Sequence, residues 1–476
     1  MTTFFRPALT AVAIAGLMTL AACQKDGGGS SAPAASGASA TAAAPAATGG
    51  GGNSTTVAAS ADKQFFPLLS YRTGPYAPNG IPWADGKQDY LKLINERDGG
   101  INGVQIAYEE CETGYATDRG VECYERLKTK PGVSMFDPQS TGITFALTEK
   151  APVDKIPLMT FGYGLSVSQN GDYFKWNFPY MGSYWTAADV LIQHLGQKEG
   201  GLDKLKGKKV TLVYHDSPFG KEPIPLVQKR AEMHGFELQM LPVTAPGVEQ
   251  KATWLQVRQS KPDYVLLWGW GVMNSTALKE AQATGFPRDK IYGVWWAGAE
   301  PDVKDVGQGA AGYNALALNG SGQDFPVVQD ILKHVYDKGN GTASSRAEVG
   351  SVLYNRGMLI QMLGVEAVRT AQEKFGKGKV MTAEQVRWGM ENLNLSKERL
   401  AELGFGDLAH PIQTTCQDHM GSMAARVQTW DGSKWNTATD WIQADQAVVG
   451  PLVTAGAEKY AAEKKIAKRD AADCGA

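Results

Sequence analysis

The sequence predicts an α/β protein of two lobes, each built around a doubly wound parallel sheet. The first observation is an alternation of short apolar, strand-like runs with helix-like segments, which begins near residue 65. The second is that the same alternation restarts near residue 208. Strands that alternate with helices form parallel sheets covered on both faces. Strand-like and helix-like segments are spread over roughly 400 residues in all, which is too many for one hydrophobic core, so two lobes are expected.

The first series contains four expected strands, each an apolar run next to turn residues. They are 65–70, 104–108, 133–136 and 156–161. Helical segments follow the first three of these strands. These helices are expected to end near residues 97, 130 and 150.

The second series repeats this order of elements. Its expected strands are 208–214, 236–241, 263–268 and 291–295. Its expected helices are 220–234, 248–259 and 275–284. Beyond them, the sequence predicts a long amphipathic helix at 349–375, a β-hairpin at 424–435 and a tail helix after residue 453.

The first residues have the pattern of an export signal. Arg6 precedes an apolar run from Ala8 to Leu20, which is shorter than the roughly 20 residues of a membrane-spanning helix. The run ends in Leu20-Ala21-Ala22-Cys23, which resembles the lipobox of bacterial lipoproteins. The alternative is an ordinary Ala-x-Ala cleavage site beside an unrelated cysteine. We expect cleavage before Cys23, lipidation of its thiol and a membrane anchor without a spanning helix.

A flexible tether is expected to follow the anchor. Residues 24–62 are largely Gly, Ala, Ser, Thr and Pro, with Val57 as the one large aliphatic residue. Such a segment cannot bury enough apolar surface to offset the entropy lost on ordering. The expected division is a signal peptide (1–22), a tether (23–62), lobe 1 (63–180, with return segments from about 325–425), lobe 2 (181–324) and a C-terminal hairpin with a tail helix (426–476).

Charge and cysteine content restrict the class of protein further. The chain has 47 basic and 49 acidic residues and no basic block, so a nucleic-acid partner is not expected. If Cys23 carries lipid, four cysteines remain, and four allow three pairings. We hypothesise Cys111 with Cys123 and Cys416 with Cys474. The 6 His residues form no ligand-like cluster and no CxxC occurs, so neither a metal nor a cofactor is expected.

Several loop motifs occur in an order that resembles a known family. They are Thr73-Gly74-Pro75 with Gly80, Asn95 to Gly103, and His215 to Gly220, followed by the turn from Asp431 to Trp435. The chain from Phe65 to Trp435 thereby resembles the type I periplasmic binding proteins of ABC importers, specifically the leucine/isoleucine/valine-binding family. The resemblance implies two α/β lobes joined by three crossings, with a ligand in the cleft. It also implies hinge closure, a location in the periplasm or cell envelope, and a membrane permease with cytoplasmic ATPases as partner. A monomer is expected.

The resemblance places two ligand-binding loops in lobe 1. Gln139, Ser140 and Thr141 fall where the family binds the ligand carboxylate, and hydroxyls with free N–H groups at a helix start suit an anion. The alternative is that Ser140 or Thr141 only caps its helix. The stretch Phe161-Gly162-Tyr163 matches a second loop whose backbone donates hydrogen bonds, although Tyr163 has the alternative of packing on the lobe surface.

Aromatic residues are expected to form the rest of the pocket wall. They are Tyr76 from the first cleft loop and Phe219, Trp270, Trp295 and Trp296 from the second lobe. Large aromatics gathered at a cleft commonly mark a binding site. A surface turn for Tyr76 and core packing for Trp295 remain alternatives. Trp268 is expected in the core, because it continues an apolar strand.

The ligand class follows from a departure from the family pattern. Amino-acid-binding members carry an acidic residue at the end of a second-lobe strand, and that position falls here on Trp295 or its neighbour. Glu300, the nearest carboxylate, is expected to lie past the cleft. An ammonium group buried without a counter-charge costs several kcal/mol. We therefore expect a small carboxylate or polar molecule with an apolar or aromatic body, with a branched-chain amino acid as the alternative.

Other functions fit the sequence less well. A ligand-sensing receptor lobe would need a signalling module, and a sugar binder would need more Asp, Asn and Arg in its loops. An enzyme is disfavoured, because the adjacent His215 and Asp216 point to opposite faces of a strand. No catalytic residue is therefore assigned.

Overall fold

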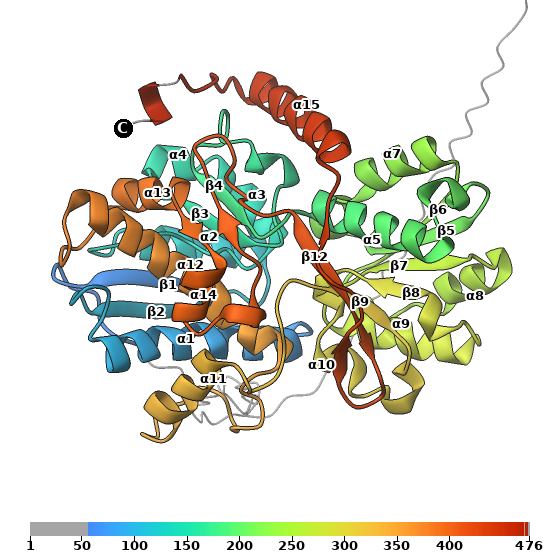
Figure 1. Cartoon of the computed structure of the whole chain (residues 1–476), viewed down its shortest axis with the longest axis horizontal. Coiled ribbons are helices and arrows are strands. Elements are labelled where there is room, and N and C mark those ends of the chain that lie inside the picture. Colours follow the sequence, from blue (N-terminus) through green and yellow to red (C-terminus); the bar gives the residue numbers. More distant parts are fainter. Residues whose placement is uncertain (1–55, 471, 475–476) are drawn as a thin grey trace, which may run out of the picture. The chain divides into compact units, whose positions relative to one another are not determined.

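The computed structural model describes residues 56–470 and 472–474 of the 476-residue chain, within the compact unit Gly49–Ala476 (Figure 1). The signal peptide, Cys23 and the tether up to residue 55 lie outside the described residues. Within the described part, no helix has both the length and the apolar character needed to cross a membrane. Val57, expected in the tether, forms an antiparallel bridge with Tyr108, so the ordered contacts begin before residue 63.

Lobe 1 is built on parallel strands. Strand β1 (Gln64–Ser70) pairs with β2 (Ile106–Glu112), and β3 (Leu158–Phe161) pairs with β4 (Asn177–Tyr180). Parallel bridges from Phe65 to Val133 and from Phe136 to Leu158 place the expected strand 133–136 between β1 and β3. It forms isolated bridges there and no continuous ladder. Every residue of β1 is buried, as the apolar run from Phe65 to Leu69 predicts.

The helices of lobe 1 come from two parts of the chain. They are α1 (Ala77–Asp98), α2 (Thr117–Leu127), α3 (Thr141–Thr148), α4 (Ala151–Asp154), α11 (Pro326–Ile331), α12 (Val352–Phe375), α13 (Ala383–Glu391) and α14 (Lys397–Glu402). A short antiparallel pair joins β10 (Asn394–Leu395) to β11 (Ile412–Gln413). Helices α1 and α12 approach so closely that a Cβ on Gly86 would meet the Tyr354 carbonyl oxygen at 2.0 Å. Glycine there permits the contact that fixes α1.

Lobe 2 is one sheet in the order β13-β12-β9-β8-β7-β5-β6, with β14 beside β12. The strands are β5 (Lys209–His215), β6 (Glu237–Val243), β7 (Tyr264–Trp268), β8 (Ile291–Gly293), β9 (Asn314–Ala317), β12 (Ala424–Trp430), β13 (Trp435–Thr437) and β14 (Ile442–Gln443). Strands β5 to β9 are parallel, and β12 runs antiparallel to β9. The expected hairpin is confirmed as β12–β13, and it extends the lobe 2 sheet.

The helices of lobe 2 are α5 (Tyr184–Glu199), α6 (Pro218–Lys221), α7 (Ile224–His234), α8 (Lys251–Ser260), α9 (Val272–Ala283) and α10 (Glu300–Val303). The expected helix 220–234 is divided into α6 and α7, because Pro223 and Pro225 cannot donate backbone hydrogen bonds. The expected strand 291–295 ends at Gly293, and a 3₁₀ turn, Trp295–Ala297, follows. Trp268 is fully buried, which confirms the expected core position.

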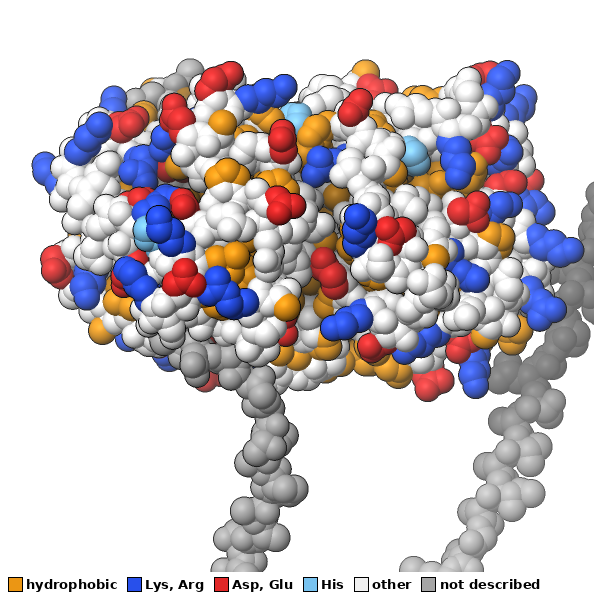
Figure 2. Space-filling model, turned by 60° about the horizontal axis from the view of Figure 1, so that its bottom comes forward, with side chains coloured by type: hydrophobic (Ala, Val, Ile, Leu, Met, Phe, Trp, Pro, Cys, Tyr) orange, Lys and Arg blue, Asp and Glu red, His pale blue; other side chains and the backbone are white. Residues whose placement is uncertain are grey.

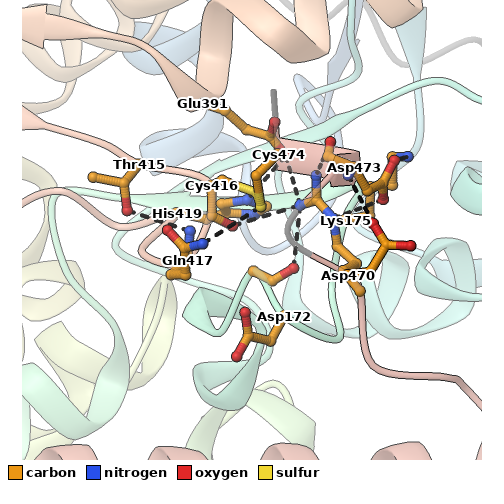
Figure 3. Close-up of a disulfide and its surroundings, with 12 residues drawn as sticks. Asp172, Lys175, Glu391, Thr415, Cys416, Gln417, His419, Asp470, Asp473 and Cys474 are labelled. Carbon is orange, nitrogen blue, oxygen red and sulfur yellow. Dashed lines mark hydrogen bonds and ion pairs between the residues drawn. A yellow bond between two sulfur atoms is a disulfide. The ribbon is translucent and has the colours of Figure 1, made fainter. Parts of the chain in front are cut away.

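The tail helix α15 (Gln446–Lys464) begins earlier than expected, because Asp445 caps it by accepting a hydrogen bond from the Ala447 N–H. Disulfides join Cys111 to Cys123 and Cys416 to Cys474, which confirms both hypothesised pairings. The second disulfide attaches the end of the tail to the loop that follows β11 (Figure 3). On the face drawn in Figure 2, basic and acidic side chains are interspersed without a large block of one sign.

Candidate ligand-binding site

A small cavity lies between the two lobes and is walled mainly by aromatic rings. Its lining is Tyr71, Trp83, Tyr115, Gln139, Ser140, Thr141, Tyr163, Tyr184, Phe219, Trp270 and Trp296. None of these side chains carries a formal charge. The free space for the centre of a water-sized sphere is ≈ 10 Å³, roughly what one water molecule needs. In this conformation the walls nearly meet, so a larger ligand requires the lobes or side chains to part.

Most of the lining follows the carboxyl ends of parallel strands, where ligands of open α/β sheets usually bind. Tyr71 directly follows β1, Tyr163 follows β3, and Trp270 follows β7. Trp296 lies in the 3₁₀ turn beyond β8. The sheets of both lobes thus direct their loops toward one place.

The start of α3 supplies the hydroxyl groups of the cavity. Ser140 is the N-cap residue, and its side chain accepts a hydrogen bond from the Ile143 N–H at 3.5 Å. The Thr141 and Tyr184 hydroxyl oxygens are 3.2 Å apart. Ser140 therefore both caps the helix and lines the cavity. First-turn N–H groups lack intrahelical acceptors, so this edge suits an oxygen or an anion.

A buried ion pair fixes the neighbouring part of the wall. Lys87 Nζ is 2.8 Å from Asp137 Oδ2, and both side chains are buried. The Tyr163 hydroxyl donates to Asp137 and accepts the Gln139 backbone N–H at 2.7 Å. Burial raises the pKa of Tyr163 well above its usual range. The phenol therefore stays neutral and holds the Gln139 backbone in place.

Four of the expected site residues do not line the cavity: Tyr76, Phe161, Gly162 and Trp295. Phe161 is buried at the end of β3. The Tyr76 hydroxyl is 2.9 Å from His215 Nε2, in a contact between the lobes. The indole N–H groups of Trp295 and Trp296 both donate to the Gly162 carbonyl, at 2.7 and 2.9 Å. Trp295 therefore packs behind the wall, whereas Trp296 both lines the cavity and bridges the lobes.

Gly162 belongs to the loop that was expected to donate backbone hydrogen bonds to the ligand. Its N–H instead donates to the Tyr180 carbonyl at 3.2 Å, as part of the β3–β4 pairing. Gly162 has φ +66°, and a Cβ there would lie 2.8 Å from Trp295 Nε1. The residue thus allows a close contact between the lobes.

Sequence reasoning missed four lining residues: Tyr71, Trp83, Tyr115 and Tyr184. Tyr71 and Tyr115 follow β1 and β2, and Tyr184 begins α5 after β4. Their position after strand ends was a signal that could have identified them. Trp83 lies within α1, where no sequence rule pointed to the cleft.

Further polar contacts hold the lobes together. Asn79 of α1 donates to Asp302 of α10 at 3.2 Å, and the Ser166 N–H donates to Glu222 at 2.9 Å. Burial raises the pKa of Asp302 and of Glu222 to about 7 in each case. The lobes therefore meet in a closed arrangement through Asp302, which is fully buried, and Glu222, which is partly buried.

Behind Trp296 lies a buried cation. The Arg356 guanidinium carbon is 4.6 Å from the centre of the Trp296 ring, and its Nη1 donates to the Trp295 carbonyl at 2.9 Å. Burial lowers the pKa of Arg356 to about 9, so it remains charged at neutral pH. Glu300 is not in the lining, and its carboxylate accepts the Val352 N–H.

The pair His215 and Asp216 shows no arrangement for acid–base chemistry. His215 faces Tyr76 and the Ser217 hydroxyl, at 2.9 and 2.8 Å. Asp216 instead forms an exposed ion pair with Lys221 at 2.7 Å. The two side chains therefore point in different directions and have different partners, as expected for adjacent residues at the end of a strand.

A model of the periplasmic binding protein family matches residues 63–434. The chain therefore belongs to the periplasmic binding protein family, and its fold is the type I fold of that family with parallel sheets in two lobes. Membership implies an extracytoplasmic location. None of the curated proteins matches the chain in sequence.

Solved structures agree with this assignment. A Pseudomonas fluorescens group protein described as an ABC transporter permease is 42% identical, has a TM-score of 0.82, and is matched over 87% of this chain and 100% of its own. A branched-chain amino acid ABC transporter from Thermus thermophilus with bound valine is 22% identical, with a TM-score of 0.68 and coverage of 82% and 98%. An R. palustris ABC transporter solute-binding protein in complex with benzoate is 16% identical, with a TM-score of 0.61 and coverage of 81% and 98%. None of these three descriptions names an enzyme.

Proposed function

We propose that this protein captures a small organic molecule between its lobes and delivers it to the membrane permease of an ABC importer. The single observation that carries the proposal is the interlobe cavity, in which aromatic rings surround the hydroxyls of Ser140 and Thr141. Lipidation of Cys23 keeps the protein at the membrane surface, and the tether lets it move there. The lobes close by a hinge motion that ligand contacts to both lobes stabilise.

The wall chemistry supports a small carboxylate or polar molecule with an apolar or aromatic body. Rings offer a large apolar surface, and the start of α3 offers donors to an oxygen. No acidic side chain lines the cavity, so an ammonium group would lose its solvation without a counter-charge. Aromatic faces offset only about 0.5–2 kcal/mol of such a loss. Arg356 behind Trp296 adds repulsion for a cation.

A branched-chain amino acid is the second candidate ligand. The Thermus thermophilus structure with bound valine has the same fold, while the R. palustris structure holds benzoate. Both similarities are below 25% identity, so they leave the choice to the side chains of this cavity. Those side chains favour a carboxylic acid that has no amino group over an amino acid.

Calorimetry with a ligand panel tests the proposal. The panel contains benzoate, phenylacetate and short-chain aliphatic acids on one side, and leucine, isoleucine and valine on the other. We expect binding of an acid from the first group, and an affinity at least tenfold lower in Ser140→Ala or Thr141→Val. Ser260→Ala, at the end of α8, is the matched control and should bind normally. Tight binding of the amino acids alone would contradict the proposed ligand class.

A further inference from the structure

Three hydrogen-bond donors of the cavity wall have no partner among the described residues. They are the Tyr71 hydroxyl and the indole N–H groups of Trp83 and Trp270. All three side chains are at least 97% buried. The Tyr71 ring stands edge-on to both indoles, with centroid distances of 6.3 Å to Trp83 and 6.2 Å to Trp270. The unpartnered donors therefore gather around one ring.

An indole N–H can only donate, so two of these groups require an acceptor. A buried donor without a partner costs the whole of its lost solvation. The Tyr71 hydroxyl can accept from one indole, and its own proton then also needs an acceptor. When a ligand fills the cavity and leaves no space for water, an oxygen of the ligand can supply that acceptor.

We infer that the ligand carries a second oxygen acceptor, a hydroxyl or carbonyl oxygen, that Trp83 and Trp270 bind. This inference rests on the proposed function, in which the first polar group faces Ser140 and Thr141. Trp83 belongs to α1 of lobe 1, and Trp270 to the loop after β7 of lobe 2. Both residues line the same cavity, so an oxygen bound by both stabilises the closed state by joining the lobes. The pair thus selects ligands with two polar groups.

Matched ligand pairs test this inference by calorimetry. The probes are benzoate and its 2-, 3- and 4-hydroxy derivatives, measured with the full chain and with Trp83→Phe and Trp270→Phe. We expect at least one hydroxy derivative to bind five- to fiftyfold more tightly than benzoate, and each variant to remove most of that preference. Trp254→Phe is the control, because the Trp254 N–H already donates to Gln250.

The binding results distinguish failure of this inference from failure of the proposed ligand class. Equal binding of benzoate and all three derivatives overturns the inference and leaves the proposed function intact. A preference that survives in both variants also overturns it, because other residues would then read the oxygen. If none of these four acids binds, the inference fails, whereas binding of phenylacetate or a short-chain aliphatic acid in the ligand panel still supports the proposed ligand class.

The C-terminal tail starts on lobe 2 and ends on lobe 1. At its start, the Asp445 N–H donates to Asp189 Oδ2 of α5 at 2.7 Å. The Asp445 side chain also lies 3.4 Å from Arg230 of α7. Figure 1 shows α15 running from these lobe 2 helices toward lobe 1.

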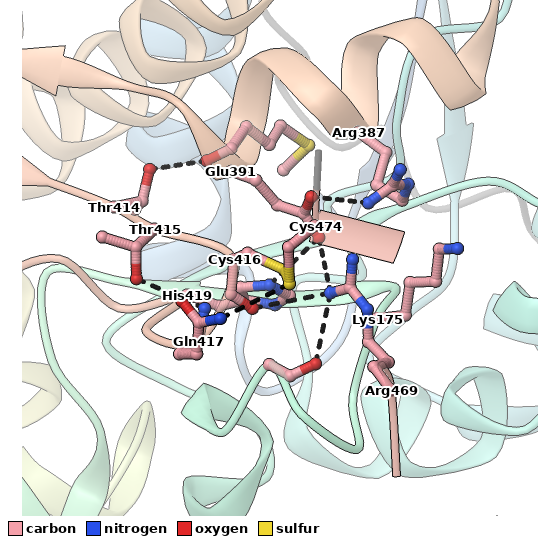
Figure 4. Close-up of polar contacts among 12 residues, drawn as sticks. Lys175, Arg387, Glu391, Thr414, Thr415, Cys416, Gln417, His419, Arg469 and Cys474 are labelled. Carbon is pink, nitrogen blue, oxygen red and sulfur yellow. Dashed lines mark hydrogen bonds and ion pairs between the residues drawn. A yellow bond between two sulfur atoms is a disulfide. The ribbon is translucent and has the colours of Figure 1, made fainter. Parts of the chain in front are cut away.

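The other end of the tail is fixed by several contacts to lobe 1. Arg469 Nη1 is 2.7 Å from Glu391 of α13, and the Arg469 N–H donates to the Asp172 carbonyl at 2.8 Å. Figure 4 shows the Arg469 guanidinium beside the Cys416–Cys474 disulfide. Cys416 precedes β12, the strand that enters the lobe 2 sheet. The disulfide therefore closes a covalent loop that leaves lobe 1 along β12 and returns along α15.

We propose that α15 and the residues after it form a strap that limits how far the lobes open. Three chain crossings join the lobes, between β4 and α5, between β9 and α11, and between β11 and β12. The strap is a fourth connection, and its fixed ends restrict separation of the lobes at α5 and α13. A narrower range of opening favours closure, because less hinge entropy is lost on binding.

Distance measurements between spin labels test the strap without any ligand. Labels at Val153→Cys in α4 and Val248→Cys before α8 report on lobe separation, since both positions are exposed. Deleting residues 465–476 together with Cys416→Ser should lengthen and broaden the distance distribution. A Cys111→Ser/Cys123→Ser variant is the control, because that disulfide lies within lobe 1. Identical distributions in the strapped and unstrapped proteins would overturn the proposal.

Discussion

His215, a buried histidine between the lobes, should contribute to stability in a way that is lost in acid. His215 is 3% exposed and contacts the Tyr76 hydroxyl. Burial lowers the pKa of His215 from 6.5 to about 4, against a smaller opposing effect of Asp216. Below pH 6.5 the unfolded chain binds a proton at this side chain, whereas the folded chain does not. Stability present above pH 6.5 is therefore lost as the pH falls toward 4.

The size of this effect follows from the shift. One pKa unit corresponds to about 1.4 kcal/mol, so the shift from 6.5 to about 4 implies a loss of roughly 3 kcal/mol between pH 7 and pH 4. Asp302 and Glu222, whose pKa values are raised, change stability in the opposite direction over this range. A comparison of variants at each pH cancels their contribution.

Urea unfolding at pH 7 and pH 4 provides the assay. We expect wild type to lose about 3 kcal/mol more unfolding free energy than His215→Gln over this interval. His334→Gln, in the turn after α11, is the control and should follow wild type. Equal losses in wild type and His215→Gln would refute the assignment of acid sensitivity to this contact.

Other predictions concern the tether, the cleft and the tail. Removing residues 24–55 should leave ligand affinity unchanged, as measured by calorimetry. Removing residues 24–62 should also cost about 1 kcal/mol of stability, measured by thermal unfolding, because the Val57–Tyr108 bridge is lost. Gly162→Ala should reduce ligand affinity at least tenfold without unfolding lobe 1, since the new Cβ meets Trp295, and unchanged affinity would contradict the closed geometry. Cys416→Ser should lower the unfolding free energy by about 2–5 kcal/mol relative to the disulfide-bonded wild type, measured by urea unfolding without reductant.

Sequence reasoning succeeded where a feature depends on neighbours along the chain. The apolar run of β1, the hairpin β12–β13 and the cap at Ser140 are local patterns, and the structure confirms them. The disulfide pairings agreed with the sequence hypothesis, although spacing alone left three pairings open. The resemblance also placed Gln139, Ser140 and Thr141 at the cavity.

It failed where a contact depends on how distant segments meet. Trp83 reaches the cavity because Gly86 lets α1 approach α12, which no local pattern reveals. The N–H of Gly162 is used by β4, whereas its carbonyl receives two indoles from lobe 2. Tyr76 contacts His215 across the lobes. The neighbouring Tyr115 lines the cavity in its place.

The central claim is that the aromatic cavity between the lobes holds a small oxygen-bearing organic ligand. The most direct test is mass spectrometry of the molecule released when protein purified from its native cells is denatured. We expect recovery, unchanged, of one small acid or polar molecule with an apolar or aromatic body and no amino group. Loss of that molecule from a Trp296→Ala variant would locate it in this cavity. Recovery of leucine, isoleucine or valine instead would contradict the account.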